Sequence, residues 1–172
     1  SAQARVLTVA SKGLIAKPFL KVDLADPEFE KRRFRMETAY YQSKLAQILF
    51  TYWLAEKQAG TGLTANSIRV PAVRVDIGKY AGLPGILQKL YALKSRFALA
   101  PEEMATAYTR LATDPAFAGV TGAYFDEKLD RVQPSATARQ PENIEAVMAL
   151  TGRYVDVEPL RRVPATEANE WR

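Results

Sequence analysis

The sequence predicts an α/β protein built around a mostly parallel sheet. Three short apolar segments with the character of buried strands alternate with three segments that have the composition and spacing of helices. Parallel strands cannot be joined by a tight turn and need a crossover connection, which is usually a helix. The alternation of strands and helices therefore favours a layered arrangement, and no internal repeat is visible.

The first strand is expected at residues 6–10. This short apolar run contains β-branched residues and stands between Arg5 and the polar triplet that begins at Ser11. The strand therefore presents Ser11 at its carboxyl end. Residues 17–37 carry many charges and no sustained period, which indicates a loop or a short surface helix.

The longest helix is expected from about Glu37 to Gln58. This segment contains no Pro or Gly, and Gly60 and Gly62 supply a stop. Its middle is apolar on nearly every side, which contact with one sheet face does not explain. We expect burial against a second helix or a partner subunit, so a homo-oligomer through the Tyr40–Gln58 helix is one expectation. Three aromatic residues there are interpreted as core or interface, not as a stacking platform for bases: Phe50, Tyr52 and Trp53.

The second half of the chain repeats the alternation. Residues 63–75 suit a strand that must end at Pro71, because proline lacks the amide proton that a sheet needs. Pro101 opens a helix that Asp114-Pro115 ends, and residues 122–125 suggest a third short strand. Pro141 then opens a last helix, which stops before Gly152.

Composition excludes several kinds of chemistry. The 172 residues include no Cys and no His, so thiolate catalysis, disulfides and the commonest nitrogen metal ligand are absent, and we expect no metal site. The net charge of +5 is scattered among 19 acidic residues, which is a weak case for nucleic acid. No apolar run is long enough to span a bilayer, so we expect no membrane span and a cytoplasmic location.

Tyr40 and Lys44 are the strongest candidates for chemistry. They are four residues apart, so on a helix they share one face and the ammonium group can approach the phenol. A phenol is a poor acid or base near neutral pH, but a nearby cation favours the phenolate form. Ser11 at a strand end can donate a hydrogen bond to a carbonyl oxygen on which negative charge develops. Taken alone, a Tyr-x-x-x-Lys pattern is more often a surface tyrosine packed on a lysine stem.

These features resemble the short-chain dehydrogenase/reductase family, in which a Ser at a strand end precedes Tyr-x-x-x-Lys on the next long helix. Four ordered segments look like its retinol dehydrogenase and protochlorophyllide reductase branch: residues 5–11, 39–46, 60–66 and 122–125. The likeness spans nearly the whole chain.

The resemblance implies a fold and a set of roles. The fold is a partial Rossmann-like, doubly wound parallel sheet with flanking helices, formed by residues 1–152 and followed by a flexible tail, 153–172. Ser11 orients and polarises the substrate, Tyr40 is the acid and base, and Lys44 holds the nicotinamide ribose of NADP or NAD. In addition to Tyr40 and Lys44, the resemblance assigns three residues to the cofactor: Pro71, Val73 and Val75.

The chain also departs from the family pattern. Val75 stands where the family has a threonine, and the catalytic asparagine of the family belongs to a segment upstream of Ser11 that this chain lacks. The glycine patterns at residues 60–62 and 81–85 do not follow a strand in the way a phosphate-binding loop does. We therefore expect the carboxyl-terminal half of such an enzyme.

Two functions follow from this. The first is reversible carbonyl reduction or alcohol oxidation with NAD(P)H, on a small apolar substrate suggested by residues 79–99, which resemble the variable substrate lid of the family. The alternative is a non-catalytic interaction module that pairs with another subunit through the apolar helix and an exposed sheet edge.

Overall fold

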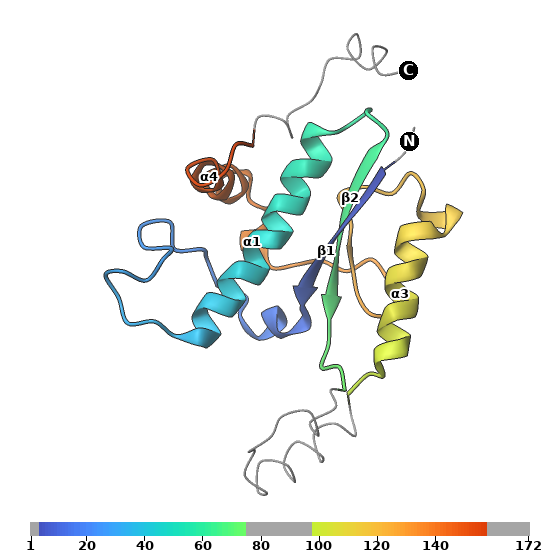
Figure 1. Cartoon of the computed structure of the whole chain (residues 1–172), viewed down its shortest axis with the longest axis horizontal. Coiled ribbons are helices and arrows are strands. Elements are labelled where there is room, and N and C mark those ends of the chain that lie inside the picture. The colour runs from blue at the N-terminus through green and yellow to red at the C-terminus, as the bar shows by residue number, and fades with distance from the viewer. Residues whose placement is uncertain (1–3, 75–97, 158–172) are drawn as a thin grey trace, which may run out of the picture.

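Helices cover both faces of a three-stranded parallel sheet in the computed structural model, which describes residues 4–74 and 98–157 (Figure 1). The strand order is β1-β2-β3, and both pairings are parallel. The expected α/β architecture is therefore confirmed. Its elements, in chain order, are β1 (Ala4–Ser11), the 3-10 helix η1 (Lys12–Ala16), α1 (Met36–Lys57), β2 (Leu63–Val70), α3 (Pro101–Thr113), η3 (Pro115–Phe117), β3 (Tyr124–Phe125), η4 (Ala136–Arg139) and α4 (Pro141–Thr151).

The strand boundaries differ slightly from those expected. β1 is longer at both ends than residues 6–10 because its whole length pairs with β2. β2 ends at Val70, one residue before Pro71. β3 is only two residues long, since Gly122 has a φ of 64° and donates its amide proton to the Ala65 carbonyl as the chain turns into the strand.

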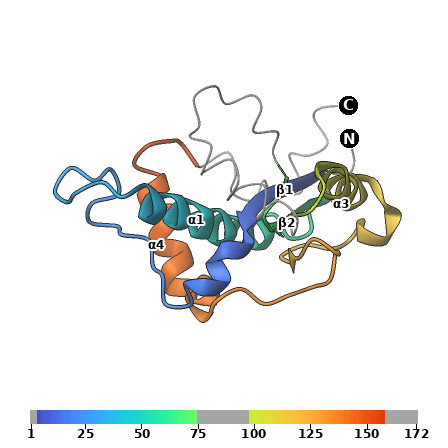
Figure 2. The same ribbon diagram turned by 90° about the horizontal axis from the view of Figure 1, so that it is seen from below.

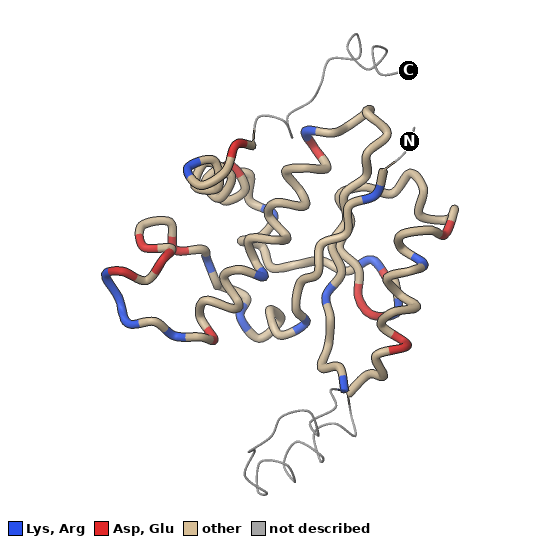
Figure 3. The backbone as a smooth tube through the Cα atoms, viewed as in Figure 1, with Lys and Arg blue, Asp and Glu red and all other residues tan. Residues whose placement is uncertain are grey.

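The charged segment between η1 and α1 forms a loop with no regular helix. Asp26 shapes it, because its carboxylate accepts hydrogen bonds from the backbone amides of Glu30, Lys31 and Arg32. Burial works against ionisation of Asp26, but these amides and the Arg32 charge hold the pKa of its carboxyl below the ordinary value. Figure 3 shows the basic residues gathered along the outer part of this loop.

The apolar surface all round α1 is buried within the chain. One side packs on the sheet, and α4 covers another, so that α1 and α4 lie side by side while α3 lies across the sheet (Figures 1 and 2). Trp53 and Leu54 share a core cluster with Met148 of α4. The expectation of a second helix against α1 is therefore confirmed. Among the described residues, no helix is both long and apolar enough to cross a membrane.

Asn66 fastens β2 to the segment that leads into β3. Its side chain is 3% exposed, donates to the Val120 carbonyl at 2.6 Å and accepts from the Ala123 amide at 3.0 Å. These two bonds satisfy backbone groups that the short strand leaves outside its ladder. The side chain therefore holds the third strand in register.

We expect Asn66→Ala to lower the free energy of unfolding by about 2–4 kcal/mol, because two buried backbone groups lose their partners. Urea denaturation measures this change. The control is Asn143→Ala, whose partly exposed amide bonds to Thr137 and Gln140 and can be replaced by water, so its cost is under about 1 kcal/mol. Equal costs for the two variants would contradict this role of Asn66.

Candidate active site

The carboxyl ends of β1 and β2 form one edge of the sheet. Ser11 is in register with Val70, so Pro71 follows immediately beside it. Open parallel α/β sheets bind ligands outside the carboxyl ends of their strands. The sequence predicted Ser11 and the 71–75 segment as separate parts of the site. The structure brings Ser11 and the start of that segment to the same edge of the sheet.

Ser11 is the residue at which β1 turns into η1. It is 8% exposed and caps η1, because its Oγ accepts the Gly13 amide proton at 3.2 Å. A serine hydroxyl can donate one hydrogen bond while it accepts others. Since the described residues show no acceptor for the Ser11 hydroxyl proton, that proton is available to a substrate oxygen.

Lys44 joins α1 to the strand that carries Ser11. Its Nζ donates to the Val9 carbonyl at 2.9 Å and to Gln47 Oε1 at 3.2 Å. The same Nζ lies 5.9 Å from the centre of the Tyr40 ring. An ammonium group has three protons, so one remains for a further acceptor. Tyr40 is 46% exposed, which leaves its hydroxyl accessible.

Pro71 and Val73 lie just beyond the end of β2. Val73 forms an isolated parallel bridge with Leu99, and the Arg74 amide donates to the Leu99 carbonyl at 2.9 Å. This pairing gives the backbone after Pro71 a defined path at the sheet edge. Val75 and most of the substrate segment at 79–99 lie outside the described residues.

Gly13 and Tyr41 form a close contact that the motifs did not indicate. A Cβ atom built on Gly13 would lie 2.5 Å from the Tyr41 hydroxyl oxygen and 2.7 Å from its ring. The Tyr41 ring therefore rests directly on the backbone of η1, and it stacks edge-on against Tyr40 with 5.1 Å between centres. Only a residue without a side chain allows η1 to approach α1 this closely.

Two ion pairs at the carboxyl-end edge of the sheet were not predicted from the sequence. Lys12 Nζ lies 2.5 Å from Glu127 Oε1, and Arg69 lies 3.5 Å from Asp126 Oδ2. Burial works against ionisation of Glu127, but the hydrogen bond from Lys12 holds the pKa of its carboxyl below the ordinary value. The first pair joins the residue after β1 to the segment after β3, and the second joins the end of β2 to the same segment. Their only sequence signal was a charge at or directly after the end of each strand.

A nicotinamide dinucleotide fits only part of this site. By the family resemblance, Tyr40, Lys44 and the backbone after Pro71 would hold the ribose and nicotinamide end. The pyrophosphate needs backbone amides at a helix start beside a strand end. Gly60 and Gly62, with φ of 82° and 84°, instead lead into the amino end of β2, at the opposite edge from Ser11. The described residues therefore show no loop of this kind at the edge that carries Ser11, and they hold no cluster suited to a metal ion.

Gly13→Ala should lower the free energy of unfolding by about 1–3 kcal/mol, because the methyl group would displace the Tyr41 ring. Gly119→Ala is the matched control, since a Cβ there meets nothing within 4 Å. That control should stay within about 0.5 kcal/mol of the parent or be slightly more stable. Thermal unfolding of both variants measures the difference in stability. A Gly13→Ala variant as stable as the parent would contradict the close contact between Gly13 and Tyr41.

The Lys12–Glu127 pair predicts a pH dependence. An acid with a lowered pKa stabilises the folded state above its ordinary value of about 4.5 and loses that contribution as pH falls through the folded pKa. We expect Glu127→Gln to be less stable than the parent at neutral pH, with the difference narrowing below about pH 4.5. Urea denaturation across this range tests it. Glu102→Gln, on the exposed first turn of α3, should follow the parent at every pH.

Comparison with known proteins identifies relatives of this chain. No family model matches the sequence. Human retinol dehydrogenase 13 is 31% identical over 161 residues, which cover 92% of this chain and 47% of the relative. Human retinol dehydrogenase 12 is 34% identical over 137 residues, covering 79% and 41%, and a probable oxidoreductase of Streptomyces lividans is 29% identical over 156 residues, covering 83% and 51%. The chain spans about half the length of the curated relatives it matches.

A solved structure has the same fold. The crystal structure of an uncharacterized protein from Mycobacterium paratuberculosis superposes with a TM-score of 0.54 at 24% identity, covering 88% of this chain and 50% of that one. The partial Rossmann-like arrangement of sheet and helices is therefore confirmed. The sequence matches show that the chain belongs to the short-chain dehydrogenase/reductase family, as a homologue of the retinol dehydrogenases over about half of their length.

Proposed function

We propose that this chain supplies the catalytic groups of an NAD(P)H-dependent oxidoreductase that reversibly reduces a small apolar carbonyl compound to an alcohol. The observation that carries the proposal is the hydrogen bond from Lys44 to the Val9 carbonyl, two residues before Ser11. This bond sets the face of α1 that bears Tyr40 against the carboxyl end of the strand that bears Ser11. The relatives are named as retinol dehydrogenases and oxidoreductases, which supports the same reaction class.

Each residue has a separate role in this proposal. The Ser11 hydroxyl donates a hydrogen bond to the substrate carbonyl oxygen and holds it in place. The Tyr40 hydroxyl gives its proton to that oxygen as negative charge develops, and takes it back in the reverse direction. The remaining proton of Lys44 would bind a ribose hydroxyl of the cofactor. NADP or NAD would supply the hydride, and Pro71, Val73 and Val75 are the residues that the family resemblance assigns to its nicotinamide.

The competing function is a non-catalytic interaction module. In the part of the chain that the structure describes, β1 is an edge strand, and Val9 on it is 37% exposed. Lys44 donates to the Val9 carbonyl. An unpaired parallel edge is a template for a further strand. In this second proposal a partner chain pairs along β1. The other expected interface, α1 over Tyr40–Gln58, is already covered by the sheet and α4.

Titration of NADPH fluorescence against the chain separates the two functions. Micromolar binding supports a working cofactor site, whereas no binding at high concentration excludes independent dehydrogenase activity and favours the interaction module. The expectation rests on the Tyr40 and Lys44 face, which fits the ribose and nicotinamide end of the cofactor.

If NADPH binds, Tyr40→Phe should lower turnover of a small aldehyde by about 10²–10⁴-fold, because the proton donor is lost. The affinity for NADPH should change little, since the ring and Lys44 remain. Tyr41→Phe is the matched control, one residue along the same helix, and should keep its turnover. Turnover that survives in Tyr40→Phe would show that Tyr40 is not the acid.

A further inference from the structure

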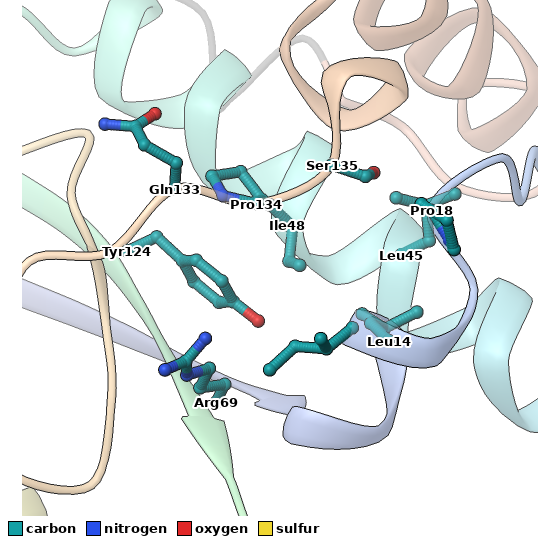
Figure 4. Close-up of a pocket in the computed structure, with 10 residues that line it drawn as sticks. Leu14, Pro18, Leu45, Ile48, Arg69, Tyr124, Gln133, Pro134 and Ser135 are labelled. Atoms are coloured by element: carbon teal, nitrogen blue, oxygen red, sulfur yellow. The ribbon is translucent and has the colours of Figure 1, made fainter.

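We propose that a cavity beneath η1 binds a small organic acid, with the carboxylate at Arg69 and Tyr124 and the apolar body against η1 and α1. The cavity has a volume of about 200 Å³ and lies between η1, α1 and residues 133–135 (Figure 4). A cavity of roughly 150 Å³ with apolar walls is large enough to hold benzene. The space therefore suits a ligand with a single ring or a short branched chain.

The walls of the cavity are apolar over most of their extent. Leu14 and Ile15 of η1 face Leu45 and Ile48 of α1 across it. Leu45 and Ile48 are 3% and 1% exposed, so they are fixed parts of the core. Ile15 is 59% exposed and belongs both to the cavity wall and to the surface, which gives a ligand a route of entry.

One end of the cavity is polar and consists of donors. Figure 4 shows the Tyr124 hydroxyl directed into the space bordered by Leu14 and Arg69. Burial raises the pKa of this phenol to about 12, so it stays protonated and can donate at neutral pH. Among the described residues no hydrogen bond to this hydroxyl is found.

Arg69 adds positive charge at the same end. Its side chain is 15% exposed, and its ion pair with Asp126 is long, at 3.5 Å, while Nε has no partner in the described part of the chain. A guanidinium group has five N–H donors, so the 3.5 Å contact with Asp126 and the electrostatic attraction to Glu127 leave donors available. The other polar side chains on the wall do not compete: Figure 4 shows the Gln133 amide directed away from Tyr124, and the Ser135 hydroxyl lies 2.8 Å from that of Thr137.

Because the Tyr124 hydroxyl and the Arg69 guanidinium group are both hydrogen-bond donors, the ligand needs an acceptor at this end. A carboxylate can accept from both, and its negative charge strengthens both hydrogen bonds. The apolar walls select an uncharged hydrocarbon body for the rest of the ligand. None of Ser11, Tyr40 and Lys44 lines this cavity, so it is separate from the catalytic groups. A ligand here would nevertheless support η1, whose first turn is capped by Ser11.

Benzoate and benzyl alcohol are suitable probes, because they share a ring and differ in the carboxylate. We expect benzoate to bind the cofactor-free chain with a Kd of the order of 1 mM or tighter, and benzyl alcohol at least tenfold more weakly. Ligand-observed and protein-observed NMR measure both affinities. The readout is binding, so it does not depend on whether the proposed oxidoreductase activity is present. A failure to bind benzoate, or equal affinity for the two probes, overturns the proposal.

Two variants locate the binding. Tyr124→Phe keeps the ring and removes the donor, so it should weaken benzoate at least tenfold and leave benzyl alcohol unchanged. Tyr108→Phe, on α3 across the sheet, is the control and should bind as the parent does. Ile15→Trp, at an exposed position, fills the cavity and should abolish binding of both probes without unfolding the chain. Benzoate affinity that survives Tyr124→Phe or Ile15→Trp places the ligand elsewhere and overturns the proposal.

Discussion

The parallel pairing of β1 with β2, with α1 as the crossover between them, is the constraint on which the rest of the structure depends. Parallel strands have their carboxyl ends at one edge, so this pairing brings Ser11 next to Val70 and the residues that follow it. The crossover also requires α1 to run back along the sheet. Its amino-terminal end, which bears Tyr40, therefore returns to the edge where Ser11 lies.

Rotation of α1 about its axis is set by contacts along one stripe of the helix. Thr51 is fully buried, and its hydroxyl oxygen lies 2.6 Å from that of Thr8 in β1. Two turns earlier, Lys44 donates to the Val9 carbonyl. Because residues 40, 44 and 51 lie on the same side of a helix, these contacts turn Tyr40 toward the strand as well. The apolar residues on the other sides pack against the sheet and α4, and that packing opposes rotation.

The same edge concentrates charge. Lys12 pairs with Glu127 just after β1 and β3 respectively, and Arg69 near the end of β2 pairs with Asp126. These pairs connect all three strands where the sheet is shortest, since β3 pairs with β2 over only two residues. They also leave Arg69 directed along the wall of the apolar cavity beneath η1. The two ion pairs thus connect the strands at this edge, and Arg69 also places positive charge at the wall of the cavity beneath η1.

The sequence by itself determined which segments form strands and helices, because apolar period, Pro and Gly act locally. It also determined the spacing of Tyr40 and Lys44, since four residues on a helix make one face. Only the tertiary structure decided what covers α1: α4 from the same chain buries a surface for which the sequence allowed a partner. The contact of Gly13 with Tyr41, the Lys12–Glu127 pair and the cavity at Tyr124 likewise arise between distant segments. The local spacing of residue types does not predict such contacts, because they form only when the crossover brings distant segments together.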